Sequence, residues 1–143
     1  MFTDRQGVIA TGAALVMFVG SAAFNPAPAE IVRSSQGNPR PVNVSLTSFS
    51  LAPDELRLKA GQPILLRIAN DSGLAHDLTA PEFFSSAAIR PVDAARISGG
   101  KVAVGPHQNV IIAMIPSAGR YPMKCSHTLH KMLGMSGTIV VDQ

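Results

Sequence analysis

One stretch near the C-terminus, CSHTLHKMLGMSG from Cys125 to Gly137, concentrates side chains that bind metal ions. It contains the only cysteine of the chain, two of its four histidines and two of its six methionines. Thiolate and thioether sulfur suit Cu(I), imidazole suits both oxidation states of copper, and a His-His-Cys set with a long axial Met forms an electron-transfer site. The stretch supplies a cysteine, a histidine and a methionine. A second histidine must come from elsewhere, and the candidates are His76 and His107.

The N-terminal 29 residues have the pattern of an export signal. A nearly apolar run from Val8 to Phe24 follows a short polar opening, and Ala27-Pro28-Ala29 has the small-x-small form that signal peptidase recognises. We therefore expect residues 1–29 to be a signal peptide, with an uncleaved membrane anchor as the alternative. After its removal we expect a periplasmic or otherwise exported protein with no stable membrane insertion.

The lone cysteine is informative in an exported protein because it cannot form an internal disulfide. Cys125 is then either a small buried hydrophobic residue or a thiolate ligand of a metal. A Cys–His hydrolase is a weaker interpretation, because no nucleophile motif or orienting acid is recognisable. We expect no enzymatic activity and name no catalytic residue.

Charge and composition argue against a nucleic-acid partner. The net charge is +3, from 12 basic and 9 acidic residues, and only 5% of the residues are aromatic. Lys and Arg form no cluster along the chain, whereas a nucleic-acid surface needs a basic patch.

The positioning elements are predicted from the hydrophobic pattern. Residues 30–41 are polar and read as a flexible lead-in to one domain over 42–143. Alternating or continuous apolar runs predict short strands. They cover 42–47, 56–58, 63–69, 101–104, 110–115, 121–125 and 138–141. The segment 79–98 is the least strand-like, with a short helix expected over 82–89. Strands at this spacing predict an all-β, antiparallel sandwich.

With these residues in place, the sequence resembles the cupredoxins, a family that includes plastocyanin, pseudoazurin and azurin. HKMLGMSGTIVV resembles the family's pattern of His, four residues, Met, one residue and Gly before a closing strand. GRYPMKC resembles the penultimate strand that delivers the Cys, and IANDSGLAHDL resembles the segment that carries the first His. The resemblance covers about Asn43 to Val141. It implies a Greek-key cupredoxin-like β-sandwich with His76, Cys125 and His130 as the trigonal ligands and Met135 as the axial ligand.

Two departures from the family pattern concern the surroundings of the metal. Asp77 stands where the family often has an Asn that links the two ligand loops by hydrogen bonds, so Asp77 is expected to do the same with an added negative charge. Cys125 and His130 are separated by four residues, as in azurin, whereas plastocyanin has two. The longer spacing leaves His127 as an alternative ligand. His107, in a Gly-Pro turn, is expected to be exposed to solvent.

The function implied by the resemblance is one-electron transfer. One type 1 copper ion would accept an electron from a donor protein and pass it to an acceptor in transient complexes, and the carrier would be a monomer. The alternative is a periplasmic copper carrier or copper-tolerance protein without a redox cycle, for which the extra His127 and Met132 would suit ligand exchange. A metal-free β-sandwich interaction module is a third class.

Overall fold

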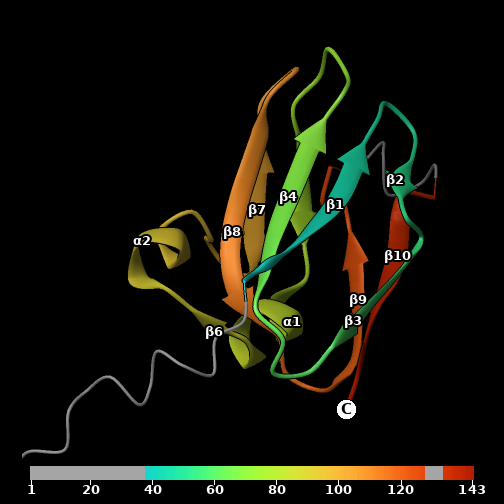
Figure 1. Cartoon of the computed structure of the whole chain (residues 1–143). Helices are drawn as coiled ribbons and strands as arrows, with labels where there is room; N and C mark the ends of the chain where they lie inside the picture. Colours follow the sequence, from blue (N-terminus) through green and yellow to red (C-terminus); the bar gives the residue numbers. More distant parts are fainter. Residues whose placement is uncertain (1–37, 128–133) are drawn as a thin grey trace, which may run out of the picture.

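The computed structural model describes residues 38–127 and 134–143, and these form two facing β-sheets. The first sheet has the order β2-β1-β4-β8-β6. Its strands are β1 Arg40–Leu46, β2 Leu51–Ala52, β4 Ile64–Asn70, β6 Ala88–Ile89 and β8 Asn109–Ile115. In Figure 1 the long strands β1, β4 and β8 lie side by side across the upper part of the view.

The second sheet has the order β3-β10-β9-β5-β7. Its strands are β3 Glu55–Lys59, β5 His76–Thr79, β7 Lys101–Val104, β9 Gly119–Lys124 and β10 Ser136–Asp142. Consecutive strands often lie in different sheets, so the chain crosses repeatedly between the two layers (Figure 1). The predicted all-β sandwich is confirmed.

The expectation of purely antiparallel sheets was wrong in two places. Strand β1 pairs in parallel with β4, and β10 pairs in parallel with β3, while the remaining pairs are antiparallel. A parallel pair needs a crossover connection, and here the chain between β1 and β4 makes that crossover through β3 of the opposite sheet. Hydrophobic alternation reports which face of a strand is buried, and it carries no information about strand direction.

The core lies between the two sheets and is mostly aliphatic. Along β4 the alternate residues Ile64, Leu66 and Ile68 are buried, as period-2 alternation requires for a strand with one inward face. Strands of both sheets contribute further buried side chains, among them Val44, Leu46, Leu58, Leu78, Val102, Val104, Ile112 and Ile139.

The segment between β5 and β7 holds the two short helices. Helix α1, Pro81–Ser86, and helix α2, Pro91–Ala94, each begin at a proline, whose fixed φ suits the first helical turn. Phe83 and Phe84 in α1 are buried, and the ring of Phe83 contacts Tyr121 of β9 with centroids 5.6 Å apart. The helix expected over 82–89 therefore exists but ends earlier. Strand β6 and helix α2 were not predicted.

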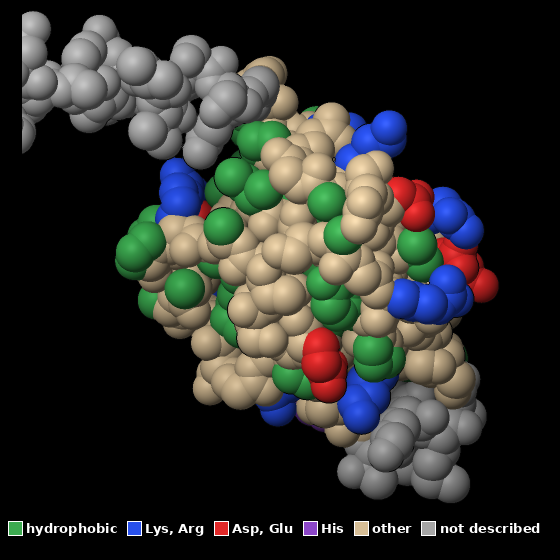
Figure 2. Space-filling model, turned by 90° about the horizontal axis from the view of Figure 1, so that it is seen from below, with side chains coloured by type: hydrophobic (Ala, Val, Ile, Leu, Met, Phe, Trp, Pro, Cys, Tyr) green, Lys and Arg blue, Asp and Glu red, His purple; other side chains and the backbone are tan. Residues whose placement is uncertain are grey.

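Two observations concern the chain outside this core. In the described residues no helix combines the length and apolar character needed to cross a bilayer. The expected signal peptide, 1–29, lies outside the described residues, and β1 begins at Arg40, two residues before the expected start of the domain at 42. Figure 2 shows the molecule from below the view of Figure 1, with hydrophobic side chains gathered toward one edge and charged side chains spread around the rim.

Candidate metal centre

Three of the residues proposed from the sequence meet at one edge of the second sheet. His76 is the first residue of β5, Cys125 directly follows β9, and Met135 directly precedes β10. Strand β9 pairs antiparallel with both β5 and β10, so the start of β5, the end of β9 and the start of β10 lie at the same end of the sheet. All three side chains are at most 1% exposed. His76 was expected in a loop, and it opens a strand instead.

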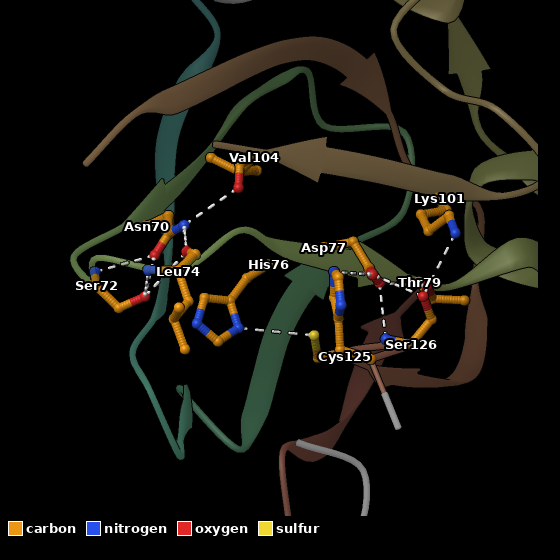
Figure 3. A network of polar contacts seen from close by, with 11 residues as sticks. Asn70, Ser72, Leu74, His76, Asp77, Thr79, Lys101, Val104, Cys125 and Ser126 are labelled. Carbon is orange, nitrogen blue, oxygen red and sulfur yellow. Dashed lines mark hydrogen bonds and ion pairs between the residues drawn. The ribbon is translucent and has the colours of Figure 1, made fainter. Parts of the chain in front are cut away.

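The side chains of His76 and Cys125 face each other. The His76 Nδ1 atom lies 3.8 Å from the Cys125 Sγ atom, and Figure 3 shows the imidazole directed at the sulfur. At bond lengths of about 2.3 Å for metal–sulfur and about 2.0 Å for metal–nitrogen, ligands that share an ion at a trigonal angle are about 3.7 Å apart. The observed separation therefore fits two ligands of one metal ion.

Cys125 is also tied to Met135 through the backbone. The Cys125 N–H donates a hydrogen bond of 3.0 Å to the Met135 carbonyl oxygen, which continues the β9–β10 ladder past the last paired residues. The sulfur-bearing residues of the candidate site are thus held at a fixed spacing by hydrogen bonding that requires no metal.

Asp77 connects the His76 strand to the residue after Cys125. Its carboxylate accepts hydrogen bonds from the Ser126 backbone N–H at 2.8 Å and from the Ser126 hydroxyl at 2.6 Å. The Thr79 hydroxyl donates a third, at 2.7 Å. The carboxylate thus makes the connection that the resemblance to the cupredoxins implies for this position (Figure 3).

The balance of burial and hydrogen bonding keeps Asp77 ionised. Burial by itself raises the pKa of this carboxyl group, but the hydrogen bonds from Ser126 and Thr79 and the positive charge of Lys101 together lower its pKa below the ordinary value of 3.8. A fixed negative charge therefore lies beside the candidate site at neutral pH.

Asn70 organises the loop that leads to His76, a role that was missed because the residue was interpreted as part of a turn. Its buried amide nitrogen lies within hydrogen-bonding distance of the carbonyl oxygens of Leu74, Val104 and Gly105, at 2.7, 3.1 and 2.9 Å. Its amide oxygen accepts from the backbone N–H and hydroxyl of Ser72, at 3.0 and 2.9 Å. The only sequence signal is the Asn-Asp-Ser-Gly composition, which indicates a turn and says nothing of burial.

The other histidines have different surroundings. The His127 side chain is 49% exposed, and its Nε2 atom lies 3.6 Å from Asp77 Oδ2. Its ring centroid is 6.4 Å from that of His76, and both residues line a cavity of ≈ 280 Å³ together with Asp77 and Lys101. His107 is exposed, as expected, in the turn between β7 and β8.

The remaining candidates lie outside the described residues. His130, the expected second histidine ligand, and Met132 fall within 128–133. Over 38–127 and 134–143 no group of three or more His, Cys, Asp or Glu side chains is arranged to hold a metal ion. The described part of the candidate centre is the pair His76 and Cys125 with Met135 beside it.

The fold has known counterparts, although no family model and no curated protein matches the sequence. The structure is similar to that of dithionite-reduced auracyanin from the photosynthetic bacterium Roseiflexus castenholzii, with a TM-score of 0.55 and 17% identity, covering 75% of this chain and all of that one. It is also similar to auracyanin B, with a TM-score of 0.54 and 18% identity over 75% of this chain and 92% of that one.

A third match is auracyanin A, described as a "blue" copper protein from Chloroflexus aurantiacus, with a TM-score of 0.48 and 21% identity over 71% of this chain and 99% of that one. At identities this low, structural similarity is evidence of a shared fold alone. The two better matches confirm that this chain has the cupredoxin-like β-sandwich fold that its sequence led us to expect.

Proposed function

We propose that this protein is a one-electron carrier that binds a single type 1 copper ion through His76, Cys125, His130 and Met135. The observation that carries the proposal is the buried contact between His76 Nδ1 and Cys125 Sγ, 3.8 Å apart at the ends of adjacent strands. A thiolate and an imidazole at this separation, with a methionine on the adjoining backbone, are a donor set suited to copper that cycles between two oxidation states. The carrier has no catalytic residues and serves transient redox partners.

The contribution of the chain is to hold its ligands still. When bound, a copper ion would take up one electron from a donor and release it to an acceptor. The backbone hydrogen bond between Cys125 and Met135, and the bonds from Ser126 to Asp77, hold the ligand-bearing segments in place without the help of a metal. Ligands that do not move add little reorganisation to electron transfer, which is why rigid surroundings favour this function.

A copper carrier without a redox cycle is the competing proposal. Ligand exchange requires that a partner's side chains reach the metal. His76 and Cys125 are at most 1% exposed, and this burial favours the electron carrier. His127 favours the copper carrier, because its half-exposed side chain beside Asp77 offers an accessible nitrogen near the buried pair.

The test is a visible spectrum of the mature protein loaded with Cu(II), followed by reduction and reoxidation. A thiolate-to-Cu(II) absorption band that disappears on reduction and returns on oxidation supports the electron carrier. A protein that binds Cu(I) tightly, stays colourless and does not cycle supports the copper carrier, and failure to bind copper excludes both.

Export is a separate part of the proposal and needs its own measurement. We propose that residues 1–29 are removed and that the protein acts in the periplasm or another exported location. N-terminal sequencing of the exported protein is expected to begin at Glu30. Recovery of the full-length chain in the membrane fraction would support the uncleaved anchor instead.

A further inference from the structure

Asp77 occupies the position between the two halves of the proposed copper site. It directly follows His76 in β5, and both oxygens of its carboxylate bind Ser126, which directly follows Cys125. The Ser126 hydroxyl donates to Oδ2 at 2.6 Å, and its backbone N–H donates to Oδ1 at 2.8 Å. One side chain therefore fixes the neighbour of one candidate ligand against the neighbour of another.

The groups that face this carboxylate come from three segments. Thr79 on its own strand donates to Oδ1 at 2.7 Å. From β7, the Lys101 Nζ atom lies 3.4 Å from the Ser126 Oγ atom, and from beyond β9, the His127 Nε2 atom lies 3.6 Å from Oδ2. Asp77 itself is 2% exposed, so solvent screens its charge poorly.

We propose that Asp77 is a positioning residue with two effects on the proposed metal centre. Its hydrogen bonds to Ser126, which make the link that the resemblance to the cupredoxins implies at this position, hold Cys125 in place. Its negative charge, which an Asn would lack, stabilises Cu(II) relative to Cu(I) and so lowers the reduction potential. The second effect rests on the proposed function, whereas the first belongs to the metal-free chain as well.

The two effects have separate physical causes. Each hydrogen bond to a charged group contributes about 1.5–3 kcal/mol, so its loss should let the segment after Cys125 open more often. A unit negative charge at a poorly screened position attracts a divalent ion more strongly than a monovalent one. An Asn at this position, as the resemblance to the cupredoxins implies, could keep hydrogen bonds to Ser126 without the charge.

The charge is tested by the reduction potential of copper-loaded variants. Asp77→Asn is expected to raise the reduction potential. At a fixed applied potential the Cu(I)/Cu(II) ratio should change about tenfold or more, which corresponds to about 59 mV for one electron. Lys101→Gln is expected to shift the potential the other way, because it removes a positive charge near Asp77. Asp71→Asn makes the same charge change at an exposed residue and should shift the potential much less.

The positioning effect is tested without metal, by the rate at which the buried Cys125 thiol reacts with an aromatic disulfide reagent. Ser126→Ala keeps the charge of Asp77 and removes one hydrogen bond, and it should speed the reaction about tenfold. Asp77→Ala should speed it more than Ser126→Ala does. Thermal unfolding of each metal-free variant checks that it folds. If the Asp77 variants do not fold, Lys101→Gln tests the charge effect and Ser126→Ala tests the positioning effect.

Each outcome is decisive for one part. Equal potentials for the wild type, Asp77→Asn and Lys101→Gln overturn the charge effect, and unchanged thiol reactivity in Ser126→Ala and Asp77→Ala overturns the positioning effect. A wild type that binds no coloured copper overturns the proposed function and with it the charge effect, while the thiol measurement still decides whether Asp77 holds Cys125.

Discussion

The two sheets of the sandwich differ in what they bring to the candidate site. His76, Cys125 and Met135 all lie at strand ends of the second sheet, next to β5, β9 and β10. The first sheet supplies buried aliphatic residues such as Leu66 and Ile68, and one buried polar residue, Asn70, at the end of β4. The difference indicates that the proposed metal site and the stability of the fold can be altered separately. Asn70 is the residue at which one change should affect both.

The largest effect is expected from replacing Cys125, the proposed sulfur ligand of the second sheet. Cys125→Ser should abolish the visible copper band completely, because a hydroxyl group cannot replace the thiolate that produces it. The measurement is the absorption spectrum of the Cu(II)-loaded variant. Met123→Leu is the matched control, since it changes a buried sulfur residue on β9, the strand that leads to Cys125, by a volume-conserving swap and should keep the band. A coloured Cys125→Ser protein with the wild-type spectrum would contradict the ligand assignment.

The next effect separates the two histidines that follow Cys125. His130→Ala should lose the coloured copper or open the site to added imidazole, because His130 is the proposed ligand. His127→Ala should keep the band, because the described His127 side chain is half exposed and lies next to Asp77. Spectra with and without imidazole are the measurement. The reverse pattern would move the ligand to His127 and would also weaken the case for Met135.

A core substitution in the first sheet should change stability and leave the metal centre alone. Leu66 is fully buried in β4, so Leu66→Ala should lower the free energy of unfolding by about 2–5 kcal/mol through lost burial and a residual cavity. Chemical denaturation measures this loss, and the copper spectrum of the folded variant should match the wild type. Leu65→Ala, on the other face of the same strand, should cost less. A shifted copper band in Leu66→Ala would show that the core of the first sheet and the proposed metal centre are not independent.

A smaller loss of stability than for Leu66→Ala is expected at Asn70, the residue that joins the sheets. Asn70→Ala should lower the free energy of unfolding by about 1–3 kcal/mol, because buried carbonyl oxygens lose their donor. Unlike Leu66→Ala, it should also weaken copper binding, since the loop that Asn70 holds ends at His76. A copper titration beside denaturation checks both. Ser72→Ala, which keeps the Asn70 amide bonds to Leu74 and Val104, should have less effect on either quantity.

The strands of the second sheet could be predicted from the sequence where alternation is clear. Lys101–Val104 was predicted with the bounds that the structure gives, and Cys125 was expected at a strand end, where it lies. The segment over 79–98 was poorly predicted, because α2 and β6 are too short to develop a periodic pattern. The proximity of His76 and Cys125 came from the resemblance to the cupredoxins, since nothing local in either segment specifies which strands pair.

Residues that act through hydrogen bonds were harder to predict than candidate ligands. The side chain of Asn70 reaches carbonyl oxygens up to 35 positions away, and that of Asp77 binds a residue 49 positions away. Such long-range partners are fixed by the strand order, which the sequence pattern does not contain. Asp77 was singled out only because it stands where the resembling family often has Asn. Asn70 differs from no family pattern that we compared, so nothing drew attention to it.

The hydrogen bond from the Cys125 N–H to the Met135 carbonyl has a consequence for how this centre can be varied. This bond joins the two residues at which the intervening segment leaves and re-enters the sandwich, so it fixes the distance between the two ends of that segment. Insertions, deletions or whole segments grafted from another protein of this fold between these two residues would leave the anchor points at the same spacing. The segment between these two residues could therefore be exchanged as a module, which would give new residue spacings on an unchanged scaffold.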